Sequence, residues 1–476
     1  MTYETVIGME VHAQLETDSK LFCTCSVAFG GAENSQTCPI CLGHPGALPV
    51  LNQKAFDLAL RAAIALDCEI SPQMSFDRKN YYYPDLPKNY QISQEHQTLG
   101  TDGHLDVEVG GQLRRIRIHN VHLEEDAGRL LHPEGKDHSL VDLNRAGTPL
   151  LEIVTQPDMR SVEEADAYMQ ALRALLLYIE VSDCRMEQGS LRFEASISLR
   201  PEGQAALGRR VEVKNLNSMR FVRKAIGYEI GRQTDLLSSG GRVEMETRLW
   251  DDAGDRSQRM RSKEKAHDYR YFAEPDLPPF PISAERVKEI RASLPELPMA
   301  KMQRFTREHG ISAYDAGVLV ADPALASYFE ELIGNGISPK GASNWTTNEV
   351  LSAMKEEGVE MKDFSLRAPA LAELIRLVES GSLNVPRARE TFLEMRKTGS
   401  SAAAIVEEKG LSQVSGKAEI QGLVEKAFVA LPKAVEDLRR GKEKARGALV
   451  GFVMRESKGK ANPAVVHQLI DSLLHP

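Results

Sequence analysis

Thr5–Glu16, "TVIGMEVHAQLE", decides the fold of the N-terminal region, because its apolar and polar residues alternate from Ile7 onward. A period of two is that of a β-strand, so the stretch is predicted to be a strand with one buried and one polar face. The apolar row is Ile7, Met9, Val11, Ala13 and Leu15; the polar row is Gly8, Glu10, His12, Gln14 and Glu16. The pleat places Glu10 and His12 about 7 Å apart. Such a face either lies in water, as in many antiparallel sheets, or lines a site.

Four cysteines follow this strand at C-x-C-x12-C-x2-C spacing: Cys23, Cys25, Cys38 and Cys41. Thiolates at this spacing converge on one tetrahedral Zn²⁺, and four sulfur ligands leave no open position. The sequence therefore predicts a structural zinc site that closes the loop after the first strand. The "CPIC" part also matches a redox motif, but no thioredoxin-like unit surrounds it. Cys68 and Cys184 lie apart from the group and are predicted core residues.

Two further stretches repeat the alternation of the first strand. Residues 189–200, "GSLRFEASISLR", and residues 211–215, "VEVKN", are predicted strands with short polar or charged residues on one face. A strand face in plain contact with water carries a looser mixture of Thr, Lys and Gln, so this composition suits a sheet face that lines a cleft. The charged residues on it are Arg192, Glu194, Glu212 and Lys214.

Acidic residues also end or interrupt two apolar strands. "VHLEEDAG" places Glu124, Glu125 and Asp126 side by side, and adjacent acids repel one another unless a cation lies between them. Glu152 lies in the apolar run "PLLEIV", where an unpaired carboxylate is costly. A hard cation such as Mg²⁺ is one partner for these oxygens. A salt bridge from Glu152 to Arg145 is the alternative.

Residues 76–94, "FDRKNYYYPDLPKNYQISQ", combine four tyrosines with the basic residues Arg78, Lys79 and Lys88. Basic and aromatic side chains together suit a phosphate-bearing ligand with a base or sugar to stack on. A surface loop that is pinned by its tyrosines explains the pattern equally well.

The chain of 476 residues is too long for one core, and 42% hydrophobic with 27% charged residues is typical of a soluble globular protein. No apolar run reaches the length of a membrane span and no secretory signal is recognised, so a cytoplasmic location is expected. Strand patterns give way to helical ones after the proline-rich residues 271–282. An α+β chain is predicted, with domains at 1–290, 291–405 and 406–476.

The C-terminal region carries a basic run in a chain whose net charge is −9. Residues 439–460 hold eight basic residues against Glu443 and Glu456. The run predicts contacts to an RNA backbone, because Lys and Arg neutralise phosphates without reading sequence. The alternative is an ordinary solvated helix face.

Several long motifs strongly resemble the B-subunit family of the tRNA-dependent amidotransferase. They are "ETVIGMEVHAQLETDSKLFC", the tyrosine-rich stretch, "HLEEDAG", "VDLNRAGTPLLEIVTQPD", "GSLRFEASISLRP", "VEVKNLNS" and "SKGKANP". The resemblance implies an antiparallel "cradle" domain related to the glutamine-synthetase and guanido-kinase fold, a helical domain and a small helical tail domain that contacts tRNA.

The same resemblance implies an activity. The family uses ATP to phosphorylate the side-chain carboxylate of Glu-tRNA(Gln) or Asp-tRNA(Asn), and ammonia then displaces the phosphate. The ammonia comes from a glutaminase A subunit, and a small C subunit completes a heterotrimer. No Walker-type or G-x-G-x-x-G motif is present, so ATP is implied by the resemblance alone.

The resemblance also implies site residues. His12, Glu125 and Glu152 match the family's Mg²⁺ ligands, and Glu10 lies close by. Lys79, Arg192, Glu124 and Lys214 are the expected nucleotide-binding residues. Glu194 is an expected catalytic residue and stands where the family has the Asp of an "RCDxN" motif, here "RFEAS". The cysteine quartet is present in some members only, in keeping with a structural role.

Two other functions fit parts of the sequence. A non-catalytic tRNA-binding subunit would have an acidic sheet face with no chemical role. A stand-alone zinc-containing nucleic-acid-binding protein would need only the cysteines and the basic tail, and it leaves the strand of Glu10 and His12 unexplained.

Overall fold

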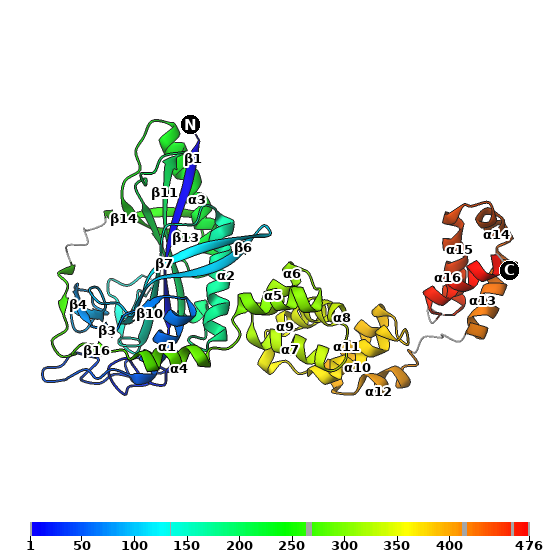
Figure 1. The fold of residues 1–476 in the computed structure, drawn as a ribbon, viewed down its shortest axis with the longest axis horizontal. Helices are drawn as coiled ribbons and strands as arrows, with labels where there is room; N and C mark the ends of the chain where they lie inside the picture. Colours follow the sequence, from blue (N-terminus) through cyan, green and yellow to red (C-terminus); the bar gives the residue numbers. More distant parts are fainter. Residues whose placement is uncertain (1, 134, 263–268, 412–416, 458–460, 475–476) are drawn as a thin grey trace. The chain divides into compact units, whose positions relative to one another are not determined.

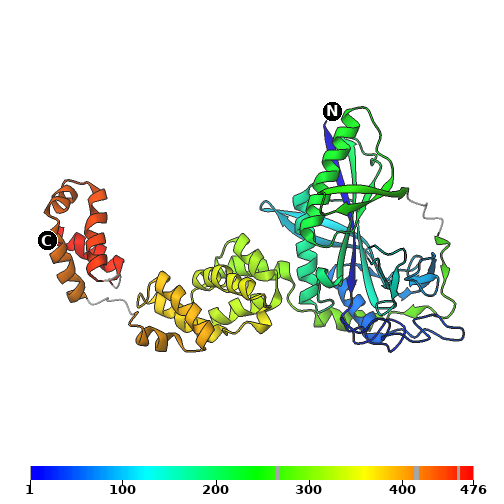
Figure 2. The ribbon, with the colours of Figure 1, turned by 180° about the vertical axis from the view of Figure 1, so that it is seen from behind.

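The computed structural model describes residues 2–133, 135–262, 269–411, 417–457 and 461–474. The chain forms two compact units, Met1–Met302 and Gln303–Pro476. The first combines sheets with helices and the second is helical, as Figures 1 and 2 show from opposite sides. This confirms the α+β prediction at that level.

In the described part of the first unit, nine strands form one sheet in the order β14-β13-β12-β11-β1-β10-β7-β6-β2. The predicted first strand, β1, lies inside this sheet, with β10 and β11 as antiparallel neighbours. Within the sheet, β12 and β13 form the parallel pair. The strands are β1 (Tyr3–Gln14), β2 (Glu69–Ile70), β6 (Gly100–Val109), β7 (Gln112–Glu125), β10 (Pro149–Thr155), β11 (Leu191–Pro201), β12 (Val211–Lys214), β13 (Glu246–Asp251) and β14 (Arg256–Ser262).

One face of the sheet forms the core with helices α1 (Gln53–Ala65), α2 (Val162–Tyr178) and α3 (Met219–Ser238). The helices α2 and α3 lie side by side in both ribbon views. The apolar row of β1 is buried as predicted, and the predicted core residues Cys68 and Cys184 are buried too. Because the apolar row of β1 packs into this core, its polar row must point to the opposite face of the sheet.

Short strands build three smaller sheets in the first unit. They are β15-β4-β5, β16-β3 and β8-β9, formed by β3 (Gln73–Met74), β4 (Asp77–Asn80), β5 (Tyr90–Ser93), β8 (Arg129–Leu131), β9 (Leu140–Asp142), β15 (Phe272–Ala273) and β16 (Phe280–Pro281). The strand β4 carries Lys79, so this part of the fold brings the tyrosine-rich segment to the large sheet, where β5 contacts β7.

The proline-rich residues 271–282 belong to the first unit. They pair with β4 and β3 as β15 and β16, and α4 (Ala284–Ser293) then packs against α1. A two-residue edge strand tolerates proline because it loses no ladder hydrogen bond there. The predicted boundaries at 290 and 405 fall inside α4 and α12, whereas the structure divides after Met302.

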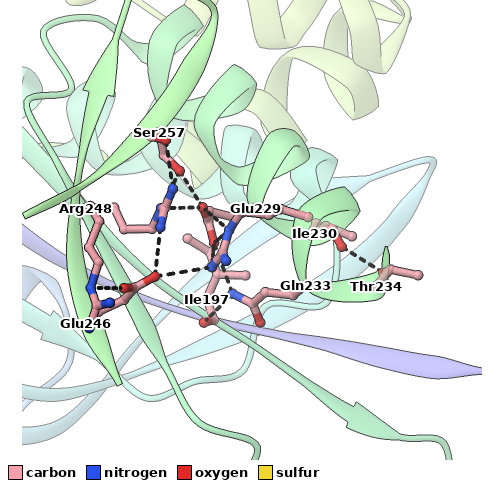
Figure 3. Close-up of polar contacts among 10 residues, drawn as sticks. Ile197, Glu229, Ile230, Gln233, Thr234, Glu246, Arg248 and Ser257 are labelled. Atoms are coloured by element: carbon pink, nitrogen blue, oxygen red, sulfur yellow. Dashed lines mark hydrogen bonds and ion pairs between the residues drawn. The ribbon is translucent and has the colours of Figure 1, made fainter. Parts of the chain in front are cut away.

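A buried ionic network joins α3 to β13 and β14 (Figure 3). The side chain of Glu229 is 0% exposed, and its carboxylate lies 2.8 Å from Arg232 and 3.2 Å from Arg248. Ser257 Oγ donates to the same carboxylate at 2.5 Å. Burial opposes ionisation of Glu229, but its hydrogen bonds from Arg232 and Ser257 hold its pKa below the ordinary value. The network fastens the two strands beyond β12 to the helix.

The second unit consists of helices. They are α6 (Ala313–Val320), α7 (Pro323–Gly334), α8 (Pro339–Asn344), α9 (Leu351–Glu357), α10 (Ala368–Glu379), α11 (Val385–Thr398), α12 (Ala402–Glu408), α13 (Lys417–Ala430), α14 (Pro432–Arg439), α15 (Arg446–Glu456) and α16 (Pro463–Leu474), while α5 (Pro298–His309) crosses the division. The helices α13 to α16 share a hydrophobic cluster of their own, as a small tail module requires. Of the predicted basic run, residues 458–460 lie outside the described ranges. In the described ranges, no helix combines the length and apolarity that a bilayer span needs.

Candidate active site

The polar face of the large sheet carries a row of chemically active side chains. His12 of β1 is the register partner of Arg192 on β11 and of Glu152 on β10, and Glu152 is the partner of His122 on β7. Direct partners in a ladder share a face and lie close together. The row Arg192–His12–Glu152–His122 therefore runs across four adjacent strands.

His12, Glu124 and Glu152 form a compact group that could hold a metal ion, with their ligand atoms all within 4.8 Å of one another. His12 Nε2 lies 3.4 Å from a Glu152 oxygen and 3.7 Å from a Glu124 oxygen. His122 approaches the same two carboxylates, at 3.1 and 3.8 Å. Two imidazoles and two carboxylates thus face one another in a largely buried site.

The charges of this group depend on one another. Burial alone would lower the pKa of His122, but the Glu152 and Glu124 carboxylates raise it to about 10, and the pKa of His12 is raised for the same reason. Burial would raise the pKa of Glu152, but the two histidines hold it well below its usual range. A metal ligand must be a neutral imidazole, so a divalent cation would displace these protons.

Of the predicted trio, His12 and Glu152 lie in this group and Glu125 lies outside it. It is part of the strand row of Val121 and Leu123, whereas Glu124 shares the face of His122. The Glu125 carboxylate forms an ion pair with Lys88 and accepts from the Ile92 amide at 2.9 Å. Adjacent residues of a strand point to opposite faces, so only one of the two glutamates can reach His12.

The alternative partner for Glu152, Arg145, lies elsewhere. Its guanidinium donates to the carbonyl oxygens of Ala127 and Gly128 at 2.9 and 2.7 Å and lies 3.6 Å from Asp126. The buried carboxylate of Glu152 is instead matched by the two histidines.

A second acidic group lies two residues along β1, with its other members on β11 and β12. Glu10, Glu194 and Glu212 bring their oxygens within 4.8 Å of one another. Lys214 Nζ lies 2.6 Å from Glu194 and 3.0 Å from Glu212. Burial, followed by the repulsion of Glu152, Glu194 and Glu212, raises the pKa of Glu10. Lys214 thus bridges two of the three carboxylates in the part of the chain that the structure describes.

Arg192 reaches the site from the edge of the first group. Its Nη2 lies 3.1 Å from Oδ1 of Asp126, a buried carboxylate that also accepts from Gln14 at 2.9 Å. Arginine carries five donors in a planar fork. One contact to Asp126 orients the guanidinium beside His12.

Lys79 lies among aromatic rings. Its Nζ is 5.1 Å from the centroid of the Tyr269 ring, and that ring lies 6.0 Å from both Tyr81 and Tyr271. Burial would lower the pKa of Lys79, but Glu124, Tyr271 and Glu152 raise it. Lys79 therefore stays charged beside the first acidic group.

The other two basic residues of the tyrosine-rich segment are engaged elsewhere. Arg78 makes a bidentate pair with Glu274 at 2.7 and 2.8 Å, and Lys88 pairs with Glu125. The expected cluster of basic side chains around a phosphate thus contains Lys79 but neither of its companions.

The four predicted zinc ligands converge. The sulfur atoms of Cys23, Cys25, Cys38 and Cys41 lie within 4.8 Å of one another, and the Cys38–Cys41 pair is 3.9 Å apart. Tetrahedral Zn–S bonds require sulfur atoms about 3.8 Å apart, so this donor set fits zinc. Hydrogen bonding from Cys23 and the charge of Lys20 lower the pKa of Cys41 to about 4, against the effect of burial. A thiolate is the form that binds metal.

His122 is the site residue that sequence reasoning missed. Its signal was present, because Val121 and Leu123 alternate with His122 and Glu124 just as the faces of β1 alternate. Reading that alternation through to the strand end also selects Glu124 rather than Glu125.

Two family models match most of the chain. A model described as the GatB/GatE catalytic domain matches residues 5–288, and one described as the GatB domain matches residues 327–474. Proteins named as the B subunit of aspartyl/glutamyl-tRNA(Asn/Gln) amidotransferase are similar over the whole length. The one from Carboxydothermus hydrogenoformans is 49% identical over 98% of both chains, and that from Thermodesulfovibrio yellowstonii is 50% identical over 100% of both.

Proposed function

This chain belongs to the GatB family, and from that premise we propose that it is the catalytic B subunit of a tRNA-dependent amidotransferase. Its substrates are Glu-tRNA(Gln), Asp-tRNA(Asn) or both, and its products are the corresponding amides. The glutaminase A subunit and the small C subunit complete the heterotrimer, and the reaction takes place in the cytoplasm.

Amide formation needs the side-chain carboxylate to be activated, because an ionised carboxylate is a poor electrophile. A carboxylate oxygen attacks the γ-phosphorus of ATP and ADP leaves, which gives an acyl phosphate. Ammonia then adds to the carbonyl carbon, loses a proton, and phosphate departs. Both steps bring several negative charges together, so positive groups at fixed positions are the main requirement.

The first group fits Mg²⁺, since carboxylate oxygens and a neutral imidazole are suitable ligands. We assign His12, Glu124 and Glu152 as ligands and His122 as the residue that orients Glu152. When bound, the ion would neutralise phosphate and carboxylate charge. Glu10, Glu194 and Glu212 offer a second set of oxygens, in which Glu194 replaces the family Asp with a longer arm.

The cationic side chains have separate roles in this proposal. Arg192, fixed by Asp126 next to His12, binds a phosphate or the substrate carboxylate through its remaining donors. Lys214 lies at the second group and Lys79 beside the first, where each balances charge on ATP or the acyl phosphate. Tyr81, Tyr269 and Tyr271 around Lys79 offer rings on which a base or ribose can stack.

The observation that carries this function is the polar row Arg192–His12–Glu152–His122 on the sheet. Two acidic groups converge on the same face, one with His12, Glu124 and Glu152 and one with Glu10, Glu194 and Glu212. A subunit that only binds tRNA has no use for two sets of converging, buried carboxylates. The zinc-stapled loop is structural, and the basic run of the tail binds the tRNA backbone.

Substitution of the adjacent residues Glu124 and Glu125, one at a time, tests the proposed function in the reconstituted heterotrimer. Glu124→Gln should abolish amide formation on both misacylated tRNAs, with glutamine or free ammonia as donor, and should weaken Mn²⁺ binding measured by electron paramagnetic resonance. Glu125→Gln is the matched control and should leave Mn²⁺ binding unchanged. The wild-type reaction should require ATP.

Each rival function predicts a different result. A non-catalytic tRNA-binding subunit would retain full amide formation with Glu124→Gln. A stand-alone zinc nucleic-acid-binding protein would bind tRNA tightly without partners, and the reconstituted mixture would form no amide. Loss of Mn²⁺ binding in Glu125→Gln but not in Glu124→Gln would overturn the assignment of the ligands.

A further inference from the structure

Lys20 is a fully buried lysine without a carboxylate partner. Its side chain is 0% exposed, and its Nζ lies 3.6 Å from Cys41 Sγ and 3.3 Å from the Leu143 carbonyl oxygen. Among the described residues, no carboxylate oxygen lies within 4 Å of this Nζ. Lys88, which lines the same cavity of about 210 Å³, has the Glu125 carboxylate as its counter-ion.

A buried ammonium is costly unless an anion compensates it. Neutral thiols and a carbonyl oxygen offer only dipoles, whereas a Cys41 thiolate offers a full charge. A zinc ion with four thiolates carries a net charge of −2, so one ammonium in contact with a sulfur ligand offsets half of that charge. The position of Lys20 is therefore suited to the metal-loaded cluster.

The loop that carries the four cysteines, here called the zinc loop, is also hydrogen-bonded to the segment that precedes β10. Asn34 donates from its backbone amide to Asp142 at 3.1 Å and accepts from the Leu143 amide at 2.8 Å. Asn144 accepts from the Gln36 amide at 2.8 Å. Lys20 adds the bond to the Leu143 carbonyl from the buried side. One turn, residues 142–144, is thus held by the loop and by Lys20 together.

This turn leads directly to the active site. The Gly147 amide donates to the Asp126 carbonyl at 2.9 Å, and the Asp126 amide donates to the Thr148 carbonyl at 2.8 Å. The Asp126 side chain in turn holds Arg192. The backbone of residues 142–148 therefore fixes the carboxylate that orients the guanidinium beside His12.

We propose that Lys20 is a positioning residue that serves as counter-ion to the zinc-bound Cys41 thiolate and couples the zinc loop to the 142–148 turn, and so to Asp126 and Arg192. The inference rests on the proposed zinc site and on the proposed role of Arg192. Lys20 acts through other residues and touches no reacting atom.

Zinc affinity is the first readout, measured on the full-length chain in the reconstituted complex by competition with a chromogenic chelator. Lys20→Met should lower zinc affinity about 10- to 100-fold, as loss of a partner of a metal ligand does. Lys88→Met, a buried lysine in the same cavity with a carboxylate partner, is the control and should keep wild-type affinity. Lys20→Arg should restore part of the loss.

Hydrogen exchange gives a second readout, which applies to the wild-type complex and to Lys20→Met. Removal of zinc from the wild-type complex should speed amide exchange at Leu143, Gly147 and Asp126, and Lys20→Met should do the same in the zinc-loaded form. Exchange in β12 and β13, far from the loop in the sheet order, should not change. These measurements do not depend on amide formation, so they separate this inference from the proposed function.

Two results would overturn the inference. Wild-type zinc affinity in Lys20→Met, or an equal loss in Lys88→Met, would show that the charge of Lys20 does not support the cluster. Unchanged exchange at residues 142–148 after zinc removal would show that the cluster does not position the turn.

Discussion

Two groups of buried charge in the first unit differ in how completely they are paired. In the network of Glu229, acids and bases alternate: Glu229 with Arg232 and Arg248, and Glu246 with Arg248 and Arg259. On the polar face of the sheet, Glu10, Glu194 and Glu212 share Lys214.

The difference separates structure from chemistry. A saturated network has no capacity left for a ligand and stabilises the fold by satisfying charges that burial would otherwise penalise. A group with excess negative charge is disfavoured by its own repulsion, and a cation relieves it. Perturbed groups of that kind cluster at functional sites. Substitutions should therefore affect stability in the Glu229 network and catalysis on the polar face of the large sheet.

The largest effect is expected from Glu152→Gln in the reconstituted heterotrimer. It should lower kcat for amide formation about 10³-fold, equivalent to ~4 kcal/mol, because a metal ligand and the partner of both histidines are lost. The free energy of unfolding of the first unit should fall by less than these ~4 kcal/mol, although His12 and His122 lose a carboxylate partner. Fluorescence of Trp250 in a Trp345→Phe background reports that unit alone. If the free energy of unfolding falls by as much as the ~4 kcal/mol lost in kcat, the proposed separation of structural and catalytic charge is wrong.

The converse substitution, Glu229→Ala, should reduce the free energy of unfolding by about 3–4 kcal/mol, because two half-buried guanidinium groups lose their fully buried carboxylate partner. The amount of amide formed per folded molecule should stay at the wild-type level. Ser257→Ala removes one hydrogen bond from the same carboxylate and should cost about 1 kcal/mol. Urea titrations followed by Trp250 fluorescence measure both, and equal losses for the two variants would contradict the ionic explanation.

The stability that Glu229 contributes should depend on pH. Its pKa in the folded chain is lowered from 4.5, so the folded state favours the ionised form and the contribution is fully present above that value. It should be lost as the pH falls through the lower folded pKa. The difference in unfolding free energy between wild type and Glu229→Gln should therefore shrink from neutral pH to about pH 3. If this difference does not change with pH, the ionised form of Glu229 is not what stabilises the fold.

The smallest effect is expected at an exposed pair with good geometry. Arg115 makes two contacts to Asp106, at 2.8 and 2.9 Å, but its side chain is 60% exposed. Arg115→Ala should change the free energy of unfolding by no more than about 0.5 kcal/mol, because water screens the pair. A double-mutant cycle with Asp106→Ala isolates the coupling. A coupling as large as that of Glu229 would show that pairing, not burial, decides the cost.

Local alternation was enough to predict the strands that build the site. The faces of β1 and β11 follow from the period-two alternation, and the structure has both strands. These features depend on neighbours within a few residues, which a sequence shows directly.

What depended on distant neighbours could not be derived in the same way. The predicted ligand was Glu125 because it followed the family resemblance and not the alternation of side chains along the strand. The ion-pair partner of Glu125, Lys88, comes from a separate segment of the chain. The match of Glu152 with His12 and His122 requires the register of three strands. The prolines of residues 271–282 favoured a domain boundary nearby. A sequence does not show that these residues form short edge strands that pair with β3 and β4.

The place of β1 inside the sheet sets an order of events during synthesis. Its partners β10 and β11 end at Thr155 and Pro201, so the first strand emerges from the ribosome long before either is made. At roughly 5–20 residues per second, the apolar row of β1 stays uncovered for on the order of 10–40 seconds. A nascent chain of this design depends on early shielding by chaperones, and a pause in translation before β11 would prolong its exposure to aggregation.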